Sequence, residues 1–359
     1  MWPGAAGFAV GGRGQPWGPG ELPIYETTLT MPIMEHKYHT DQIPDKMDLK
    51  RAFERVSGVV RHTPLLSSQT FDRMTGGKLL FKCENFQTGG AFKFRGAVNA
   101  VNSLPEAEAR KGVATHSSGN HAQAVALAAR MRGISATIVM PETAPQVKVN
   151  AVRGYGADIR FCEATLAARE AALERVVAET GASFIHPSND VRVIAGQSTV
   201  FQEMQQDAAG LDMVLTPVGG GGLLSGTALA AKLLTEAESA ESVKVIGCEP
   251  AQADDAYRSF KSGELVFPDH PDTIADGLKT ALGSNTFPIV RKFVDDIVLV
   301  QEEEILQAMK LIWERMKIVV EPSAAVPLAA LLNGSLDVRG ARVGIILSGG
   351  NVDLDALPW

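Results

Sequence analysis

A regular alternation of short apolar runs with longer, helically spaced segments constrains the fold of this chain more than any other feature. Strands are predicted at residues 79–81, 113–115, 136–139, 158–161, 183–185, 213–215, 243–247 and 343–347. Helices are predicted at residues 48–60, 97–101, 122–131, 147–155, 166–180, 193–206, 302–317 and 322–332. Because strands that alternate with helices usually pair in parallel through crossover connections, the pattern predicts an α/β protein.

Composition and charge argue against several classes of protein. The 359 residues are 45% hydrophobic and 21% charged, and no apolar run reaches the roughly 18 residues of a membrane helix. The formal net charge is -7 and no basic block stands out, so we expect neither a nucleic-acid partner nor a membrane. Cys83, Cys162 and Cys248 are too widely spaced for a metal-ligand pair or a disulfide framework, so we expect reduced thiols and a cytoplasmic location.

Residues 1–46 lack the pattern of the rest of the chain. Residues 1–23 are rich in glycine, proline and tryptophan. They also lack the charged start and apolar core of a signal peptide. We therefore expect residues 1–46 to be a disordered extension, or a start assigned too early, with Met31, Met34 and Met47 as alternatives.

A lysine lies between two phenylalanines at the start of a predicted helix, in the stretch 89–97. Bulky apolar neighbours such as Phe92 and Phe94 reduce the hydration of the Lys93 ammonium. Its pKa then falls, and the neutral amine becomes a nucleophile that can condense with an aldehyde. A helix start whose lysine extends to water fits this stretch equally well.

Four consecutive glycines, Gly219 to Gly222, follow the predicted strand at 213–215 and lead into Leu223. Residues without a Cβ atom let backbone amides converge on an anion, and the N-terminus of a following helix favours negative charge. No Gly-Lys-Ser/Thr follows, and the acidic partner of a dinucleotide site is missing. A phosphate-binding loop is therefore favoured over a flexible turn and over a dehydrogenase site.

A reactive lysine and a phosphate loop together predict one ligand that carries both an aldehyde and a phosphate. Pyridoxal 5′-phosphate is such a ligand. Two further residues fit it. Asn120, at a strand-to-helix turn, can donate to a ring hydroxyl, and Ser348, after the last strand, can face a ring nitrogen.

Four motifs, in order, resemble those of the fold type II pyridoxal-phosphate enzymes, the serine/threonine dehydratase and serine racemase family. They are residues 82–97, residues 115–124, the glycine loop and residues 347–353. The likeness covers residues 47–359 and is greatest to serine racemases and bacterial 3-hydroxyaspartate dehydratases. It implies a tryptophan-synthase-beta-like α/β fold of two lobes, each with a central, mostly parallel sheet flanked by helices. The large lobe would comprise residues 47–111 and 189–359, and the small mobile lobe residues 112–188.

The resemblance also implies a role for each matching residue. Lys93 would hold the coenzyme as an internal Schiff base and later act as a base at the substrate Cα. The neutral hydroxyl of Ser348 would not keep the ring nitrogen protonated, which weakens the electron sink and suits elimination. The coenzyme-binding residues implied are Phe92, Lys93, Asn120, Gly219, Gly220, Gly221, Gly222, Leu223, Glu321 and Ser348.

The substrate-binding residues implied are Ser117, Ser118, Asn120, His121 and Arg169. Ser118 resembles the acid/base of serine racemases on the face opposite the lysine, or it is a hydroxyl that binds the substrate carboxylate. Arg169 would bind a second carboxylate, or it is an exposed helix residue. Ser188 and Ser198 depart from the family's asparagine and glycine, so the sequence leaves the favoured amino acid open.

Glu249, Ala253 and Asp255 match positions at which relatives bind magnesium or calcium. Two carboxylates and a backbone carbonyl suit Mg²⁺, Ca²⁺ or Mn²⁺. Without the resemblance, the same residues fit the acidic start of a helix.

Together these features predict an ammonia-lyase that eliminates water from L-serine, L-threonine or 3-hydroxyaspartate. Its products would be a 2-oxo acid or imine and ammonia. A serine racemase with side dehydratase activity is an alternative, and so, from another class, is a catalytically silent protein that binds a phosphate ligand on the same fold. The expected partners are a small amino acid and, as in most relatives, a second copy in a homodimer.

Overall fold

The computed structural model describes residues 43–235 and 242–359. Residues 1–42 of the predicted extension therefore lie outside the described residues. Asp45 caps helix α2 (Lys46–Val56), since its carboxylate accepts hydrogen bonds from the backbone of Met47 and Asp48. A cap of this kind satisfies N–H groups that have no partner inside the helix.

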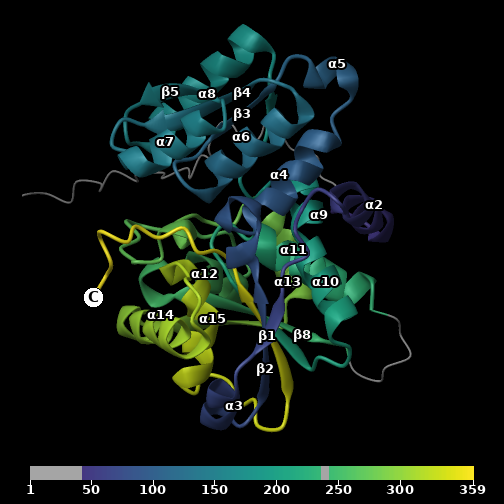
Figure 1. Cartoon of the computed structure of the whole chain (residues 1–359), viewed down its shortest axis with the longest axis vertical. Coiled ribbons are helices and arrows are strands. Elements are labelled where there is room, and N and C mark those ends of the chain that lie inside the picture. Colours follow the sequence, from purple (N-terminus) through teal and green to yellow (C-terminus); the bar gives the residue numbers. More distant parts are fainter. Residues whose placement is uncertain (1–42, 236–241) are drawn as a thin grey trace, which may run out of the picture.

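The strands form two separate sheets (Figure 1). The four-stranded sheet is parallel throughout and has the order β5 (Asp158–Cys162), β4 (Ala136–Pro141), β3 (Val113–His116) and β6 (Ser183–Phe184). The six-stranded sheet has the order β1 (Leu65–Ser67), β2 (Lys78–Cys83), β10 (Arg342–Leu347), β7 (Met213–Pro217), β8 (Lys244–Pro250) and β9 (Asp296–Val300). Only its β1–β2 pair is antiparallel. The predicted α/β class with two mostly parallel sheets is confirmed.

Helices flank both sheets (Figure 1). Those near the four-stranded sheet are α4 (Lys93–Asn102), α5 (Glu106–Ala109), α6 (Asn120–Arg132), α7 (Gln146–Gly154) and α8 (Leu166–Thr180). Those near the six-stranded sheet are α3 (Gln69–Thr75), α10 (Thr199–Asp207), α11 (Gly222–Leu233), α12 (Asp255–Ser262), α13 (Thr286–Phe293), α14 (Glu302–Met316) and α15 (Pro322–Leu332). Helix α9 (Val191–Gln197) packs on α2, α4 and α11, and so lies where the two sheets meet.

Short 3₁₀ turns complete the described structure: η1 (Glu84–Phe86), η2 (Thr88–Gly90), η3 (Ala251–Ala253) and η4 (Asp276–Leu278). Each of them lies in a connection and not within a sheet or a long helix.

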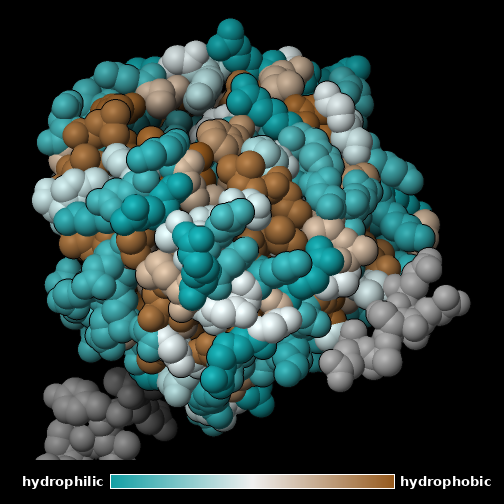
Figure 2. Space-filling model, turned by 60° about the horizontal axis from the view of Figure 1, so that its bottom comes forward, coloured by the Kyte–Doolittle hydropathy of each residue, from teal (hydrophilic) through white to brown (hydrophobic). Residues whose placement is uncertain are grey.

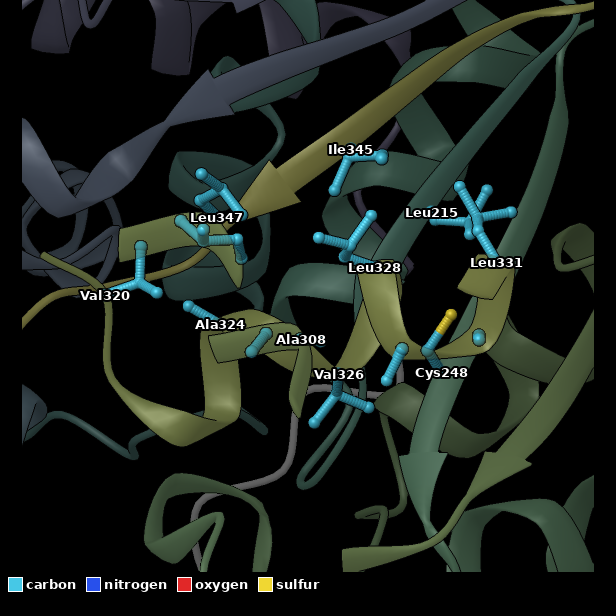
Figure 3. Close-up of a cluster of buried hydrophobic side chains, with 14 of the residues drawn as sticks. Leu215, Cys248, Ala308, Val320, Ala324, Val326, Leu328, Leu331, Ile345 and Leu347 are labelled. Carbon is cyan, nitrogen blue, oxygen red and sulfur yellow. The ribbon is translucent and has the colours of Figure 1, made fainter. Parts of the chain in front are cut away.

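The core of the large sheet follows the two-residue period of a strand. In β10, Val343, Ile345 and Leu347 belong to the hydrophobic cluster formed with α14 and α15, whereas Ile346 belongs to the cluster on the other face. Figure 3 shows Ile345 and Leu347 close to Leu328 of α15. Because helices cover both faces, the strand reads in sequence as a continuous apolar run.

The predicted elements occur within a few residues of the expected positions, with two differences. The helix predicted at 48–60 ends at Val56, and Gly58 follows with a φ of 80°. The helix predicted at 193–206 is divided at Ser198 into α9 and α10. There the Ser198 hydroxyl donates to the carbonyl of Ala195 at 2.6 Å, and such a local bond competes with continuous helix.

Three further features concern the helices, the surface and the cysteines. Among the described residues we find no helix with the length and apolar character needed to span a bilayer. On the face shown in Figure 2, hydrophobic residues lie in small groups among hydrophilic ones. Cys83, Cys162 and Cys248 are free thiols and all three are buried.

Candidate active site

Three of the predicted site segments follow adjacent strands of the large sheet. The sheet order β2–β10–β7 brings together the Lys93 segment, Ser348 and the glycine loop, which follow β2, β10 and β7 in turn. Because these strands are parallel, all three segments emerge at the same edge. The carboxyl edge of a parallel sheet is the usual place for a ligand in α/β proteins.

Lys93 is the first residue of α4, and its amine points into the region between the two sheets. The Nζ atom donates a hydrogen bond to the carbonyl of Pro187 at 2.9 Å and lies 5.0 Å from the centre of the Phe92 ring. Burial of the amine lowers the pKa of Lys93 to about 8, against the smaller opposing effect of Glu321. The structure thus gives this lysine the low pKa that its apolar neighbours predict.

Helix α4 is fixed by a buried arginine two residues after Lys93. The Arg95 guanidinium donates to both carboxylate oxygens of Glu84, each at 2.8 Å, and to both of Glu203, each at 2.7 Å. Lys82 of β2 also pairs with Glu203 at 2.8 Å. Arg95, Glu84 and Lys82 are fully buried, so these charges stabilise one another in a region that water does not reach.

Ser348 lies beside the lysine segment through backbone contacts. Its carbonyl accepts a hydrogen bond from the N–H of Phe92 at 2.9 Å, and Ala91 forms an isolated bridge with Gly349. Ser348 is buried. These contacts hold the end of β10 against the residues directly before Lys93.

The glycine loop is packed too closely to accept larger residues. Gly221 has a φ of +79°, and a Cβ atom at that position would lie 2.6 Å from Cδ2 of Leu282. A Cβ atom at Gly220 would collide with the hydroxyl of Ser188. The loop leads into α11, which starts at Gly222, so unpaired N–H groups of the first helical turn point toward the loop.

The lysine and the glycine loop meet at one dipeptide. Pro187 accepts the hydrogen bond from Lys93, and the adjacent Ser188 touches Gly220 and Gly222. This dipeptide follows β6 and connects the four-stranded sheet with α9. The Lys93 amine and the glycine loop therefore contact the same short connection.

A second loop, residues 278–286, packs against the glycine loop. The sequence alone does not predict this role. The Thr286 hydroxyl donates to the Gly220 carbonyl at 3.0 Å. The Asn189 side chain accepts from the N–H groups of Asn285 at 2.8 Å and Thr286 at 3.2 Å. Neither periodicity nor a glycine pattern marks this loop in the sequence, because its role depends on contacts with distant residues.

Asn120, the first residue of α6, and Glu321, directly before α15, come together in the structure. The Asn120 amide donates to both Glu321 oxygens, at 2.9 and 3.1 Å, and its own oxygen accepts from Asn351 at 2.9 Å. Burial raises the pKa of Glu321 to about 7, and the Asn120 hydrogen bond opposes this rise. Glu321 can therefore carry or release a proton near neutral pH.

The turn after β3 carries the predicted substrate residues Ser117 and Ser118, and His121 follows as the second residue of α6. Ser117 and Ser118 are half-buried. His121 is buried, and one ring nitrogen lies 3.0 Å from the carbonyl of Ile185. Burial, with help from the Lys93 charge, lowers the pKa of His121 to about 3, so the ring is neutral at physiological pH.

Arg169 lies in the first turn of α8, and its Nε atom is 3.4 Å from the carbonyl of Thr165. Burial and, as the smaller effect, the Arg169 charge together lower the pKa of His116 to about 4. His116 is the last residue of β3 and directly precedes Ser117. Helix α8 packs on β3, so Arg169 lies on an element that adjoins the strand leading into the serine turn.

The residues predicted to bind a metal form a buried acidic pair. Both oxygens of the Asp255 carboxylate are buried without a hydrogen-bond partner. The Glu249 oxygens accept from the N–H groups of Ala256 at 2.9 Å and Tyr257 at 2.7 Å. Burial raises the pKa of Glu249, and the Asp255 carboxylate raises it further. In the described part of the chain no three His, Cys, Asp or Glu side chains converge on one point.

Comparisons with known proteins agree with this geometry. The chain is 51% identical over 317 residues to the beta-hydroxyaspartate dehydratase of Paracoccus denitrificans (strain Pd 1222), which covers 88% of this chain and 99% of that protein. It is 48% identical over 316 residues to the serine racemase of Dictyostelium discoideum, covering 86% and 95% of the two chains. Among solved structures, maize serine racemase superposes with a TM-score of 0.84 at 44% identity, covering 88% of this chain and 95% of that chain.

Residues 56–349 also match the family described as pyridoxal-phosphate dependent enzyme. This match includes the lysine segment, the serine turn, the glycine loop and Ser348. The predicted fold type II architecture and dependence on pyridoxal phosphate are thereby confirmed. The chain belongs to the pyridoxal-phosphate dependent enzymes.

Proposed function

We propose that this enzyme eliminates water from a 3-hydroxy amino acid and releases a 2-oxo acid or imine with ammonia. One observation carries the proposal: the Lys93 amine and the Gly219–Gly222 loop both contact the dipeptide Pro187–Ser188. A ligand with an aldehyde and a phosphate can therefore reach both groups. The likeness to a protein named beta-hydroxyaspartate dehydratase supports the same reaction class.

The described residues fit the coenzyme. Lys93 would hold its aldehyde end, the amides of Gly219 to Gly222 and Leu223 its phosphate, and Phe92 would pack on the ring. The three polar residues around the ring would be Asn120, Glu321 and Ser348. When bound, pyridoxal 5′-phosphate would withdraw electrons from the substrate Cα and so make the Cα proton acidic.

Lys93 would remove that proton. Because its pKa is about 8, a substantial share of the amine is neutral near physiological pH. Loss of the Cα proton and cleavage of the Cβ–O bond would together expel the hydroxyl as water. Ser348 offers a neutral hydroxyl to the ring nitrogen and so favours this prompt elimination over a long-lived carbanion.

We place 3-hydroxyaspartate first among the substrates. Arg169 supports this choice because it lies in the first turn of α8, the helix that packs on β3, and β3 leads into the serine turn. A guanidinium at this end of β3 can bind a carboxylate on the substrate side chain with two parallel hydrogen bonds. The backbone of Ser117, Ser118, Asn120 and His121 would bind the α-carboxylate that every amino acid carries.

Racemisation of serine is the second candidate, and Ser118 favours it. Its hydroxyl lies in the half-buried turn between β3 and α6, which is separate from the α4 start that carries Lys93. A hydroxyl on the face opposite Lys93 would return a proton to Cα from that side and invert the centre. Relatives named serine racemase support this candidate.

Glu249, Asp255 and the carbonyl of Ala253 would bind a magnesium, calcium or manganese ion. The observation behind this proposal is the Asp255 carboxylate, which is buried and has no hydrogen-bond partner. A divalent cation would neutralise both carboxylates and satisfy these oxygens. Its effect would be structural or activating, because no described contact links these residues to Lys93 or the serine turn.

We further propose that residues 112–188 act as a smaller lobe that closes on the rest of the chain when substrate enters. We also propose that the enzyme is a homodimer located in the cytoplasm; the free thiols of Cys83, Cys162 and Cys248 fit a reducing compartment. Size-exclusion chromatography with light scattering would test the dimer.

The test of function is a substrate panel with chiral analysis. Purified enzyme with pyridoxal phosphate and magnesium would receive serine, threonine and the four stereoisomers of 3-hydroxyaspartate. We expect 2-oxo acid and ammonia, most rapidly from one 3-hydroxyaspartate isomer. Ser118→Ala should spare dehydration of an L-substrate more than racemisation. If no member of the panel yields ammonia in the presence of a coenzyme-loaded Lys93, the dehydratase proposal is wrong.

A further inference from the structure

An ion pair joins a helix of the small sheet to a loop of the large sheet. The Lys148 Nζ atom of α7 donates to Oδ2 of Asp276 in η4 at 2.8 Å. The two residues are 128 positions apart in sequence. Helix α7 packs on the four-stranded sheet, whereas η4 packs on α15 of the other part of the fold.

The Asp276 side of this pair adjoins the coenzyme site. The next residue, Gly277, donates its N–H to the hydroxyl of Ser323 at 3.2 Å, two residues after Glu321. A Cβ atom at Gly219 would lie 2.8 Å from Cα of Leu278. Turn η4 therefore lies between the glycine loop and the start of α15. Any movement of η4 would be transmitted directly to these two segments.

Both charges of the pair act on Glu321. Burial raises the pKa of Glu321, the Asp276 carboxylate raises it further, and the Lys148 ammonium lowers it. Glu321 also accepts the hydrogen bonds of Asn120, which starts helix α6 of the small sheet. The Lys148–Asp276 ion pair and the Asn120–Glu321 hydrogen bonds therefore both connect the small-sheet part of the molecule with the large-sheet part. We call the exposed ion pair the outer contact and the partly buried hydrogen bonds the inner contact.

The inner contacts depend on groups that the proposed reaction uses. Asn120 and Lys93 both donate hydrogen bonds across the site, to Glu321 and Pro187. Lys148 and Asp276 are 27% and 57% exposed, and neither has a role in the proposed chemistry. Exposed ion pairs are weak, so this pair can favour the closed form and still be broken in every cycle.

We propose that Lys148 and Asp276 are positioning residues that hold the small sheet closed over the site, with the serine turn and Arg169 facing Lys93. This inference rests on the proposed function, because it assigns the pair to closure around an amino-acid substrate. Opening would separate the ammonium from the carboxylate. Closing would restore the pair after each substrate has entered.

Charge reversal in the coenzyme-loaded full chain tests this proposal. The variants are Lys148→Glu, Asp276→Lys and the double reversal that restores the pair with opposite polarity. The first measurement is amide hydrogen exchange of residues 117–120 and 185–188 without substrate, which reports opening of the site directly. The second is kcat/KM on the best substrate.

We expect each single reversal to raise exchange in both segments and to lower kcat/KM, each by about threefold to tenfold. The double reversal should return both values to within about twofold of the original enzyme. The matched control is Lys261–Asp296, a 2.7 Å pair that joins α12 to β9 within the large-sheet part. Its single reversals should leave exchange at residues 117–120 and 185–188 unchanged.

Two outcomes would overturn the inference: a double reversal as open as the single variants, or an equal effect from the control pair. A protein that folds poorly would show raised exchange throughout its core and no recovery in the double variant. If the original enzyme turns over no amino acid, the proposed function fails. The exchange measurements then still decide whether the pair holds the two sheets together.

Discussion

Lys93 shows how a few contacts set the chemistry of one side chain. The amine donates to the Pro187 carbonyl and lies 5.0 Å from the centre of the Phe92 ring, and the Glu321 charge also acts on it. Burial favours the neutral amine and Glu321 favours the ammonium, and burial is the larger effect. The result is an amine that is nucleophilic at a pH where an exposed lysine is almost fully protonated.

This pKa gives a prediction for the enzyme stripped of coenzyme. Only the deprotonated amine attacks an aldehyde, so the rate of pyridoxal phosphate addition should rise with pH up to about 8 and then level off. An ordinary lysine would continue to gain reactivity up to its usual pKa of 10.5. Stopped-flow absorbance measures the rate. Lys93→Ala should abolish both the rapid phase and turnover, and a plateau near pH 10 in the original protein would contradict the prediction.

Arg169 gives a prediction about substrate choice. Arg169→Ala should lower kcat/KM for 3-hydroxyaspartate by about 100-fold or more, because a charge-assisted bidentate contact contributes about 3 kcal/mol or more. Activity on serine, which has no second carboxylate, should fall by less than about threefold. Equal losses on both substrates would show that Arg169 supports the fold and not the side-chain carboxylate. Arg175→Ala, further along α8, is the control.

The individual site residues differ in how well the sequence reveals them. Lys93 and Ser348 stand in motifs with recognisable neighbours, and the structure places them side by side. The Pro187 carbonyl could not be predicted, because a backbone acceptor carries no mark in the sequence. Thr286 was also missed, since its contact with Gly220 joins residues 66 positions apart.

At the scale of elements, the first turn of α4 depends on charged side chains that are buried. Arg95 belongs to α4, Glu84 to η1 and Glu203 to α10, and the three side chains meet in the interior. Burial disfavours the guanidinium ion, yet the two carboxylates raise the pKa of Arg95 above its ordinary value. These ion pairs hold α4, whose first residue is Lys93, against η1 and α10.

Removing the arginine should therefore be costly. Arg95→Met would leave the buried Glu84 carboxylate with no cationic partner and Glu203 with Lys82, so we expect a loss of about 3–5 kcal/mol in the free energy of unfolding. Urea denaturation followed by circular dichroism measures this loss. Arg160→Met, which breaks an exposed pair with Asp158 within β5, should cost less than about 1 kcal/mol. Similar losses in the two variants would refute the special role of the buried cluster.

Two strands of the large sheet, β1 and β9, are not predicted from the sequence. Strand β1 has only three residues, which is too few for a period to be read. Strand β9 has five residues, as many as the predicted strand β7, so its length does not explain the omission. Both lie at the edges of the large sheet. Longer elements such as α8 and α15 have the predicted bounds because their spacing is repeated over several turns.

At the scale of the whole molecule, the acidic pair Glu249–Asp255 predicts that metal ions stabilise the folded state. A chelator should lower Tm by roughly 5 °C or more, because a site at 100-fold saturation contributes about 2.7 kcal/mol. Differential scanning fluorimetry with and without magnesium measures the shift. Asp255→Asn should abolish the response, whereas Asp254→Asn, which removes an exposed carboxylate paired with Arg258, should keep it. An unchanged Tm in the chelated protein would contradict the metal site.

The order of strands in the large sheet has a consequence for how the chain is made. Strand β10, residues 342–347, lies between β2 and β7, whereas every strand of the small sheet falls within residues 113–184. On the ribosome the small sheet can complete its pairing while the large one still has a gap at its centre. During that interval the facing edges of β2 and β7 have no neighbour, and we expect nascent chains to need protection by chaperones until the last strand emerges.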